Sequence, residues 1–217
     1  MARGYAAASV VALVVGVGCL GHSAWIYAKA FVAQRLIEVA WERTATRGGD
    51  AALGRAGGGD AGGRGDGAGA KPWPWADTYP VARLTLGRGS GSLMVLEGSS
   101  GRNLAFGPTH DPASVLPGET GNSVIEGHRD THFGALQVLR VGDVIRVERS
   151  GGRRESFVVV DLHVADSRFS RIALESDAPR LTLVTCYPFD AVRPGGPLRY
   201  VVTADKVVVT ADNYVLH

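Results

Sequence analysis

One cysteine carries the clearest chemical signal in the sequence. Cys186 ends the apolar run Leu181–Thr185 and is followed by Tyr187 and Pro188. The other cysteine, Cys19, lies in a long apolar segment near the N-terminus, so Cys186 has no evident disulfide partner. An unpaired thiol is either a small buried hydrophobe or a nucleophile kept for its reactivity, and its neighbours must decide between these interpretations.

A basic residue is expected beside this thiol. Leu181–Cys186 and Arg199–Thr203 read as strands, and a 12-residue loop rich in proline and glycine joins them. If they pair as a hairpin, Cys186 and Arg199 face each other at its loop end, about 4.5–5.5 Å apart at Cα. A guanidinium there favours the thiolate and can hold a developing oxyanion, and the alternative is a solvated arginine at a barrel rim. Arg193, inside the loop, is a weaker candidate.

The third candidate is a histidine at the end of another predicted strand. His128 follows the strand Asn122–Glu126 and Gly127, a residue that lets the backbone approach a neighbour closely. An imidazole there can serve as the acid–base partner of a thiol. His132 is four residues further on, but a zinc site would need a helix and a third ligand, so we expect no metal. The other histidines of this region look like surface or loop residues: His110, His163 and His217.

Short strands must position these three side chains. From residue 71 to 217, aliphatic and β-branched runs alternate with clusters of glycine, serine and proline. Long helical periods are missing, and short helices are expected only near Ala113–Leu116 and Gly134–Leu139. The pattern predicts a mostly antiparallel barrel or sandwich of about eight strands. The expected strands are Ala82–Leu86, Leu93–Leu96, Asn122–Glu126, Val144–Glu148, Ser156–Val164, Leu181–Thr185, Tyr200–Thr203 and Val207–Thr210.

The N-terminal segment predicts a membrane anchor. Gly4–Ala28 contains no Asp, Glu, Lys or Arg, and as a helix its 25 residues would reach roughly 37 Å, enough to cross a hydrocarbon core of about 30 Å. A cleaved signal peptide is the alternative, because Ala28–Ala30 has small residues around a lysine. Phe31–Trp41 reads as a short helix that continues the anchor. We expect the N-terminus inside the cell and the remaining chain outside.

Composition divides the rest of the chain. Of the 27 residues from 44 to 70, 11 are glycine and none is aromatic, which predicts a flexible linker. The expected organisation is therefore an anchor with its juxtamembrane helix at 1–43, a linker at 44–70 and a folded domain at 71–217. The formal net charge of +2 and the lack of an RNA-binding signature argue against a nucleic-acid partner.

Three short motifs, in order, resemble one enzyme family. Thr182–Cys186 fits the sortase signature of Thr-Leu, a variable residue, Thr and the nucleophilic Cys. Gly127–Asp130 resembles the segment that holds the sortase histidine, and Arg199–Val202 resembles the strand that opens with the sortase arginine. The continuation Cys186–Asp190 is most similar to sortases of Gram-negative bacteria, called class GN, and to the related class D group. The resemblance covers about Tyr79–Thr210.

The resemblance implies an eight-stranded sortase-type β-barrel and a cysteine transpeptidase on the periplasmic side of a bacterial inner membrane. Cys186 would cleave an LPxTG-like sorting signal at Thr-Gly through a thioester, and an amine acceptor would then receive the protein. His128 would protonate the leaving amine and deprotonate the incoming one, while Arg199 would bind the signal and the oxyanion. No cofactor is implied, and the calcium ligands of some sortases have no counterpart that we can assign here.

Two alternatives remain at this point. A cysteine hydrolase of the same fold would let water resolve the thioester. A non-catalytic, membrane-tethered β-barrel binding module would keep Cys186 as an inert core residue. An L,D-transpeptidase is disfavoured, because a Ser-x-Gly-Cys run is absent before the cysteine.

Overall fold

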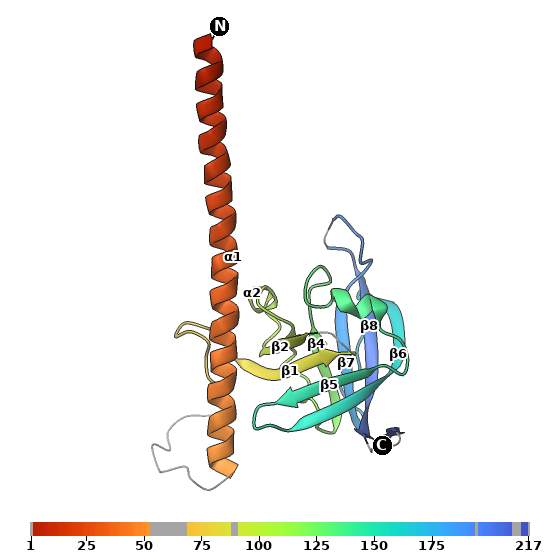
Figure 1. Ribbon diagram of the computed structural model, residues 1–217. Helices are drawn as coiled ribbons and strands as arrows, with labels where there is room; N and C mark the ends of the chain where they lie inside the picture. Colours follow the sequence, from red (N-terminus) through yellow and green to blue (C-terminus); the bar gives the residue numbers. More distant parts are fainter. Residues whose placement is uncertain (1, 53–68, 88–90, 194, 210–213, 217) are drawn as a thin grey trace. The chain divides into compact units, whose positions relative to one another are not determined.

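The chain forms two compact units, Met1–Leu36 and Ile37–His217. The computed structural model describes residues 2–216 except for 53–68, 88–90, 194 and 210–213, and it describes side chains only between residues 13 and 46 and between 69 and 207. Figure 1 shows the first unit as part of one long helix and the second as a β-barrel.

Helix α1, Ala2–Ala52, covers the predicted anchor and the helix expected after it. Among the described residues, no helix is long and apolar enough to cross a membrane. Residues 4–12 of the predicted anchor lie outside the described side chains. The helix also continues through residues 44–52, the beginning of the predicted linker, although this segment contains two adjacent glycines. Residues 53–68 of that linker lie outside the described part of the chain.

The second unit begins inside this helix. Ile37, Ala40 and Trp41 are buried, and the guanidinium of Arg83 lies 5.6 Å from the centre of a Trp41 ring. The hydroxyl of Thr44 accepts a hydrogen bond of 2.8 Å from the N–H of residue 70. The last turns of α1 therefore pack as part of the folded domain.

Eight strands close into a barrel, and a ninth extends it (Figure 1). The sheet order is β6-β5-β1-β2-β3-β4-β7-β8-β9, and an additional pairing of β6 with β8 closes the ring of the first eight. Two short helical segments lie between strands, α2 at Gly101–Leu104 and the 3₁₀ helix η1 at Gly134–Val138. The strands are β1 Pro80–Leu86, β2 Ser92–Glu97, β3 Thr109–His110, β4 Gly121–Glu126, β5 Val144–Arg149, β6 Arg154–Asp166, β7 Pro179–Cys186, β8 Leu198–Val209 and β9 Tyr214–Leu216.

The predicted eight-stranded, mostly antiparallel barrel is confirmed, with differences in detail. The pairs β2–β3 and β4–β7 are parallel, whereas the others are antiparallel. Strand β8 is continuous where two strands were expected, because it pairs with β6 along most of its length. The helix expected at Ala113–Leu116 is wrong: the carboxylate of Asp111 accepts from the N–H of Ala113 at 2.9 Å, which fixes a turn instead.

The core follows the alternation of the strands. Successive side chains point to opposite faces, so every second residue of a strand faces the interior. Leu181 and Leu183 of β7, Val202 of β8 and Ile125 of β4 belong to one buried apolar cluster. The residues between them on these three strands face outward, and the site is built from this outer face.

Candidate active site

The predicted hairpin is confirmed, and its register pairs the thiol with the arginine. Strands β7 and β8 are antiparallel, and Cys186 lies opposite Arg199 at the end of their pairing. The N–H of Tyr187 donates to the carbonyl of Leu198 at 3.0 Å and closes the mouth of the connecting loop. Paired Cα atoms of antiparallel strands lie about 4.5–5.5 Å apart. The thiol and the guanidinium therefore start from neighbouring backbone positions.

Both residues belong to the outward-facing rows of their strands. Leu181 and Leu183 face the core, so the alternate residues of β7, which end with Cys186, face outward. The same alternation on β8 places Val202 inside and Arg199 outside. Cys186 and Arg199 are each half-exposed. Solvent and a bound substrate can therefore reach this edge of the hairpin from the outer face.

A parallel pairing brings His128 to the same rim. Strand β4 lies parallel to β7, and the last pair in their register is Glu126 with Val184. His128 and Cys186 each follow this pair by two residues. The contact continues past the strand end, because the N–H of Gly127 donates to the carbonyl of Val184 at 3.1 Å. Since parallel strands end at one edge of the sheet, the exposed His128 lies at the edge where Cys186 lies.

Two contacts hold the turn that carries His128. The hydroxyl of Thr185 donates to the carbonyl of Gly127 at 2.7 Å, and this bond is buried. A Cβ atom at Gly127 would lie 2.7 Å from the ring of Phe133, so a larger residue would displace the turn or the ring. The close backbone approach predicted at Gly127 is confirmed.

Backbone carbonyls and one carboxyl surround the arginine. The Nη1 atom of Arg199 donates to the carbonyl of Gly196 at 2.7 Å and to that of Leu198 at 2.9 Å. Glu126, half-buried at the end of β4, lies close enough for its charge to interact with the guanidinium. Burial raises the pKa of the Glu126 carboxyl, Asp111 raises this pKa further, and the positive charge of Arg199 lowers it. The arginine is thus held near the rim without a direct carboxylate partner among the described side chains.

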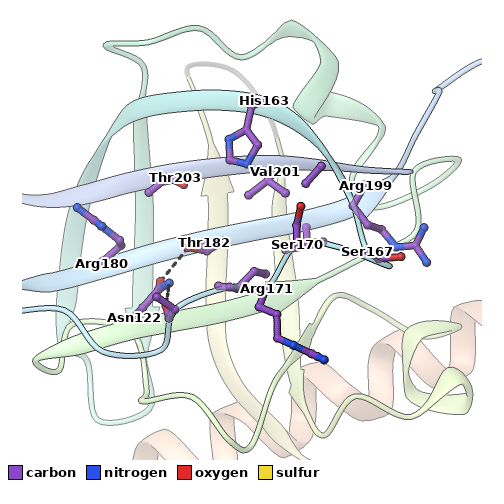
Figure 2. A pocket seen from close by; sticks show the side chains of 14 residues that line it. Asn122, His163, Ser167, Ser170, Arg171, Arg180, Thr182, Arg199, Val201 and Thr203 are labelled. Atoms are coloured by element: carbon purple, nitrogen blue, oxygen red, sulfur yellow. Dashed lines mark hydrogen bonds between the residues drawn. The ribbon is translucent and has the colours of Figure 1, made fainter. Parts of the chain in front are cut away.

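A groove leads to this rim. It encloses about 260 Å³ on the outer face of β6, β7 and β8, and the segment after β6 forms a wall. Figure 2 shows Arg180 near one end of the groove and Arg199 near the other. Outward residues of β7 line it at Arg180, Thr182 and Val184, and Cys186 is the next residue of that row. An extended peptide in the groove would therefore reach the thiol at its end.

His163 is a groove residue that the sequence analysis missed. It lies on β6 opposite Val201, and Ala165, two residues further along β6, lies opposite Arg199. Figure 2 shows its ring over the groove. The Nδ1 atom lies 2.5 Å from Oδ2 of Asp161, which fixes the ring. His163 was expected only to be a surface or loop residue. Its place in the groove depends on the pairing of β6 with β8, which the sequence analysis did not predict.

The other sequence candidates are placed elsewhere or held differently. Arg193 is an exposed loop residue. The carboxylate of Asp130 is bonded to Arg129 at 3.0 Å rather than to the histidine ring. His132 is half-buried, and burial and the nearby His128 both lower its pKa. Within the described part of the chain, no group of three His, Cys, Asp or Glu side chains could hold a metal ion.

Comparison with known proteins defines the class. A family model of the sortase domain matches residues 87–207, more than half of the chain. The chain therefore belongs to the sortase family. Within that family, it is 33% identical over 124 residues to Sortase D of Bacillus subtilis (strain 168). This match covers 57% of the chain and 62% of the relative, so less than two thirds of the relative's length is spanned.

Solved structures agree on the fold. Sortase A from Corynebacterium diphtheriae is similar with a TM-score of 0.56 and 25% identity, over 64% of this chain and 66% of that one. A Sortase D5 transpeptidase from Clostridium perfringens is similar with a TM-score of 0.52 and 24% identity, over 60% and 80% of the two chains. The expected sortase-type barrel is confirmed, and the Sortase D relative supports the predicted resemblance to class D.

Proposed function

We propose that the protein is a cysteine transpeptidase that cleaves an LPxTG-like sorting signal between Thr and Gly and transfers the acyl part to an amine. The observation that carries this proposal is the register across three strands. It pairs Cys186 with Arg199 and brings His128 to the same rim, at the end of a groove on the outer face. Family membership supports the same reading.

The first half-reaction forms a thioester. The thiolate of Cys186 attacks the carbonyl carbon of the Thr residue, and the negative charge that develops on the carbonyl oxygen is stabilised by the guanidinium of Arg199. The C–N bond to Gly then breaks, and His128 as imidazolium gives its proton to the leaving amine. The acyl group remains on sulfur.

The second half-reaction releases the product. An amine acceptor attacks the thioester carbon, His128 takes a proton from the attacking nitrogen, and the thiolate leaves. A new amide bond replaces the C–S bond, and the thiolate and imidazolium are restored. If water took the place of the amine, the product would be a free acid, which is the hydrolase alternative.

The groove is proposed to bind the acyl side of the signal. An extended peptide advances about 3.3 Å per residue, so four residues need about 13 Å. Arg180 and Cys186 are six residues apart on β7, which corresponds to about 20 Å by the same rise. The outer face is therefore long enough for the four acyl-side residues of the motif.

Anchoring and location stay predictions from the sequence. The proposed place is the periplasmic side of an inner membrane, with the N-terminal helix as the anchor and a protein substrate that carries a C-terminal sorting signal. Fractionation of cells that express the full chain tests the anchor, which requires the protein to pellet with membranes and to resist extraction at high pH. Protease added to spheroplasts tests the side, since digestion of the barrel supports the proposed location.

The direct test is capture of the thioester. The full chain is incubated with an LPxTG-type peptide, with and without hydroxylamine as the amine, and analysed by mass spectrometry. We expect an acyl adduct on Cys186 and an amine-dependent hydroxamate product. Cys186→Ala should form neither, whereas Cys19→Ala, the matched control, should form both. An unmodified Cys186 with no product would leave the binding-module alternative.

A further inference from the structure

One buried cation lies beside the site and has no part in the proposed chemistry. Only 8% of Arg129, the residue after His128, is exposed. Burying a guanidinium costs free energy unless its N–H groups find acceptors. Nη1 donates to the carbonyl of Pro188 at 2.7 Å and Nη2 to that of Ala191 at 2.6 Å, while Nε donates to the carboxylate of Asp130 at 3.0 Å.

These bonds join the two loops that carry the reacting groups. Arg129 adjoins His128, and Pro188 follows Cys186 by two residues. A single side chain therefore spans from the turn with the imidazole to the loop directly after the thiol. The two carbonyls are met by the two Nη atoms of one planar group, a forked arrangement that fixes direction as well as distance.

In the loop after Cys186, Phe189 packs against Tyr200 with ring centres 5.2 Å apart, whereas most of the loop residues described beyond it are exposed. Val192 is 97% exposed, and residues 190 and 193 are also exposed. The N–H of Ala191 makes a long bond of 3.4 Å to the carbonyl of Pro188, which is a contact within the loop. The bonds from Arg129 are shorter and come from another element, so they fix the first half of this loop to the histidine turn.

We infer that Arg129 is a positioning residue for the proposed reaction: its bonds to Pro188 and Ala191 set the distance and angle between the imidazole of His128 and the thiol of Cys186. The inference rests on the proposed function and goes beyond it. Loss of these bonds lets both loops shift, and a misplacement of about 1 Å can cost about 100-fold in rate. Arg129 does not line the groove, so substrate binding should change little.

The test separates positioning from simple support of the fold. Arg129→Gln removes the charge and the fork, and Arg129→Lys keeps the charge but offers one ammonium in place of the fork. Arg149→Gln is the matched control, because Arg149 is also largely buried and ion-paired, at 2.9 Å to Glu119, but it ends β5 and is not bonded to the loop after Cys186. Each full-length variant is assayed for kcat and KM with an LPxTG-type peptide and hydroxylamine, and for thermal unfolding.

We expect Arg129→Gln to lower kcat about 10- to 100-fold with little change in KM, and Arg129→Lys to recover only part of the loss. Because Arg129 acts through His128, the double variant His128→Ala/Arg129→Gln should be no slower than His128→Ala alone. Arg149→Gln should lower the melting temperature without this loss of kcat.

Three results would overturn the inference. The first is a kcat of Arg129→Gln equal to that of the wild type; the second is a loss in the double variant that is the product of the single losses; the third is a rise of KM alone. If Arg129→Gln shows no cooperative melt, Arg129→Lys is judged by the same criteria. The wild-type thioester is measured in the same assay, so failure of the proposed function appears as no acyl adduct on wild-type Cys186, independently of the variants.

Discussion

The rim that carries Cys186 and the end of β3 each hold a histidine at or just after the end of a strand, but they hold it in opposite ways. His110 ends β3 and only 2% of it is exposed. Its Nδ1 lies 2.9 Å from Oε2 of Glu97 and its Nε2 lies 3.0 Å from the carbonyl of Val115. His128 is exposed, and within the described part of the chain its bonds are backbone ones, such as that from the N–H of Phe133 at 2.9 Å.

The difference is between a buried histidine with partners at both ring nitrogens and an exposed one, to which we assign proton transfer in the proposed reaction. A carbonyl only accepts, so Nε2 of His110 must carry a proton, and the carboxylate on the other side favours a proton on Nδ1 as well. Burial lowers the pKa of His110, but its bonds to Glu97 and Val115 and the charge of Asp111 raise it overall. Both nitrogens of the His110 ring are therefore held by partners, whereas the ring of His128 is exposed.

The largest effect is expected at the rim. His128→Ala removes the proposed acid–base group and should lower the rate of acyl transfer about 10²–10⁴-fold. The melting temperature should stay near that of the wild type, because the side chain is exposed. Steady-state kinetics and thermal unfolding of the full chain measure both. His132→Gln, on the same turn, is the matched control and should keep most of its activity; equal losses in both variants would contradict the special role of His128.

The next largest effect should be a loss of stability with little change in the rate of acyl transfer. His110→Gln leaves the carboxylate of Glu97 without its cationic partner and should lower the free energy of unfolding by about 1–3 kcal/mol. The rate of acyl transfer in the folded variant should change little. Urea unfolding followed by circular dichroism gives the stability. A loss of catalysis without a loss of stability would mean that His110 belongs to the active site.

Local pairings could be predicted from the sequence, and distant ones could not. The pairing of Cys186 with Arg199 in the strand register follows from two apolar runs joined by one loop, because consecutive strands usually pair. The position of His128 depends on the parallel pairing of β4 with β7, across the intervening strands β5 and β6. Nothing in the spacing of residues specifies that pairing, although the place of His128 after a predicted strand and the resemblance to sortases both pointed to this histidine.

Some details carried no usable signal in the chain. Strand β3 has two residues, too few for an alternation to be recognised, yet it bridges β2 and β4. The helix expected at Ala113–Leu116 does not form, because the side chain of Asp111, two residues before this segment, accepts a hydrogen bond from the N–H of Ala113 and fixes a turn. Arg129 lies inside a quoted motif, but its burial and its carbonyl partners depend on the folded loop.

A smaller effect is expected in the groove. His163→Ala should raise KM for an LPxTG-type peptide about fivefold, the equivalent of one hydrogen bond of about 1 kcal/mol, and should leave kcat nearly unchanged. Asp161→Asn, which keeps the ring but removes the charge beside it, should have a weaker effect in the same direction. Initial rates over a range of peptide concentrations measure this. A change confined to kcat would move His163 from the binding groove into the proton-transfer machinery and weaken the contrast with His128.

The smallest effect is the pH dependence of the difference in unfolding free energy between the wild type and His110→Gln. Its pKa in the folded protein lies above the ordinary imidazole value of about 6.5, so the bonded cation stabilises the folded state fully below that pH. This contribution is lost as the pH rises through the raised pKa, after which the ring is neutral in both states. The charged groups that face the ring are Glu97 and Asp111.

Wild type and His110→Gln should therefore differ most in unfolding free energy at pH 5–6, and the gap should narrow toward pH 9. Urea unfolding at matched ionic strength across this range measures the gap, and subtraction removes the titration of His132 and the other groups that both proteins share. The opposite trend, a gap that widens with rising pH, would mean that the buried ring is neutral in the folded state. Glu97 would then have to donate the proton between them, and the distinction between a fixed and a free histidine would rest on burial alone.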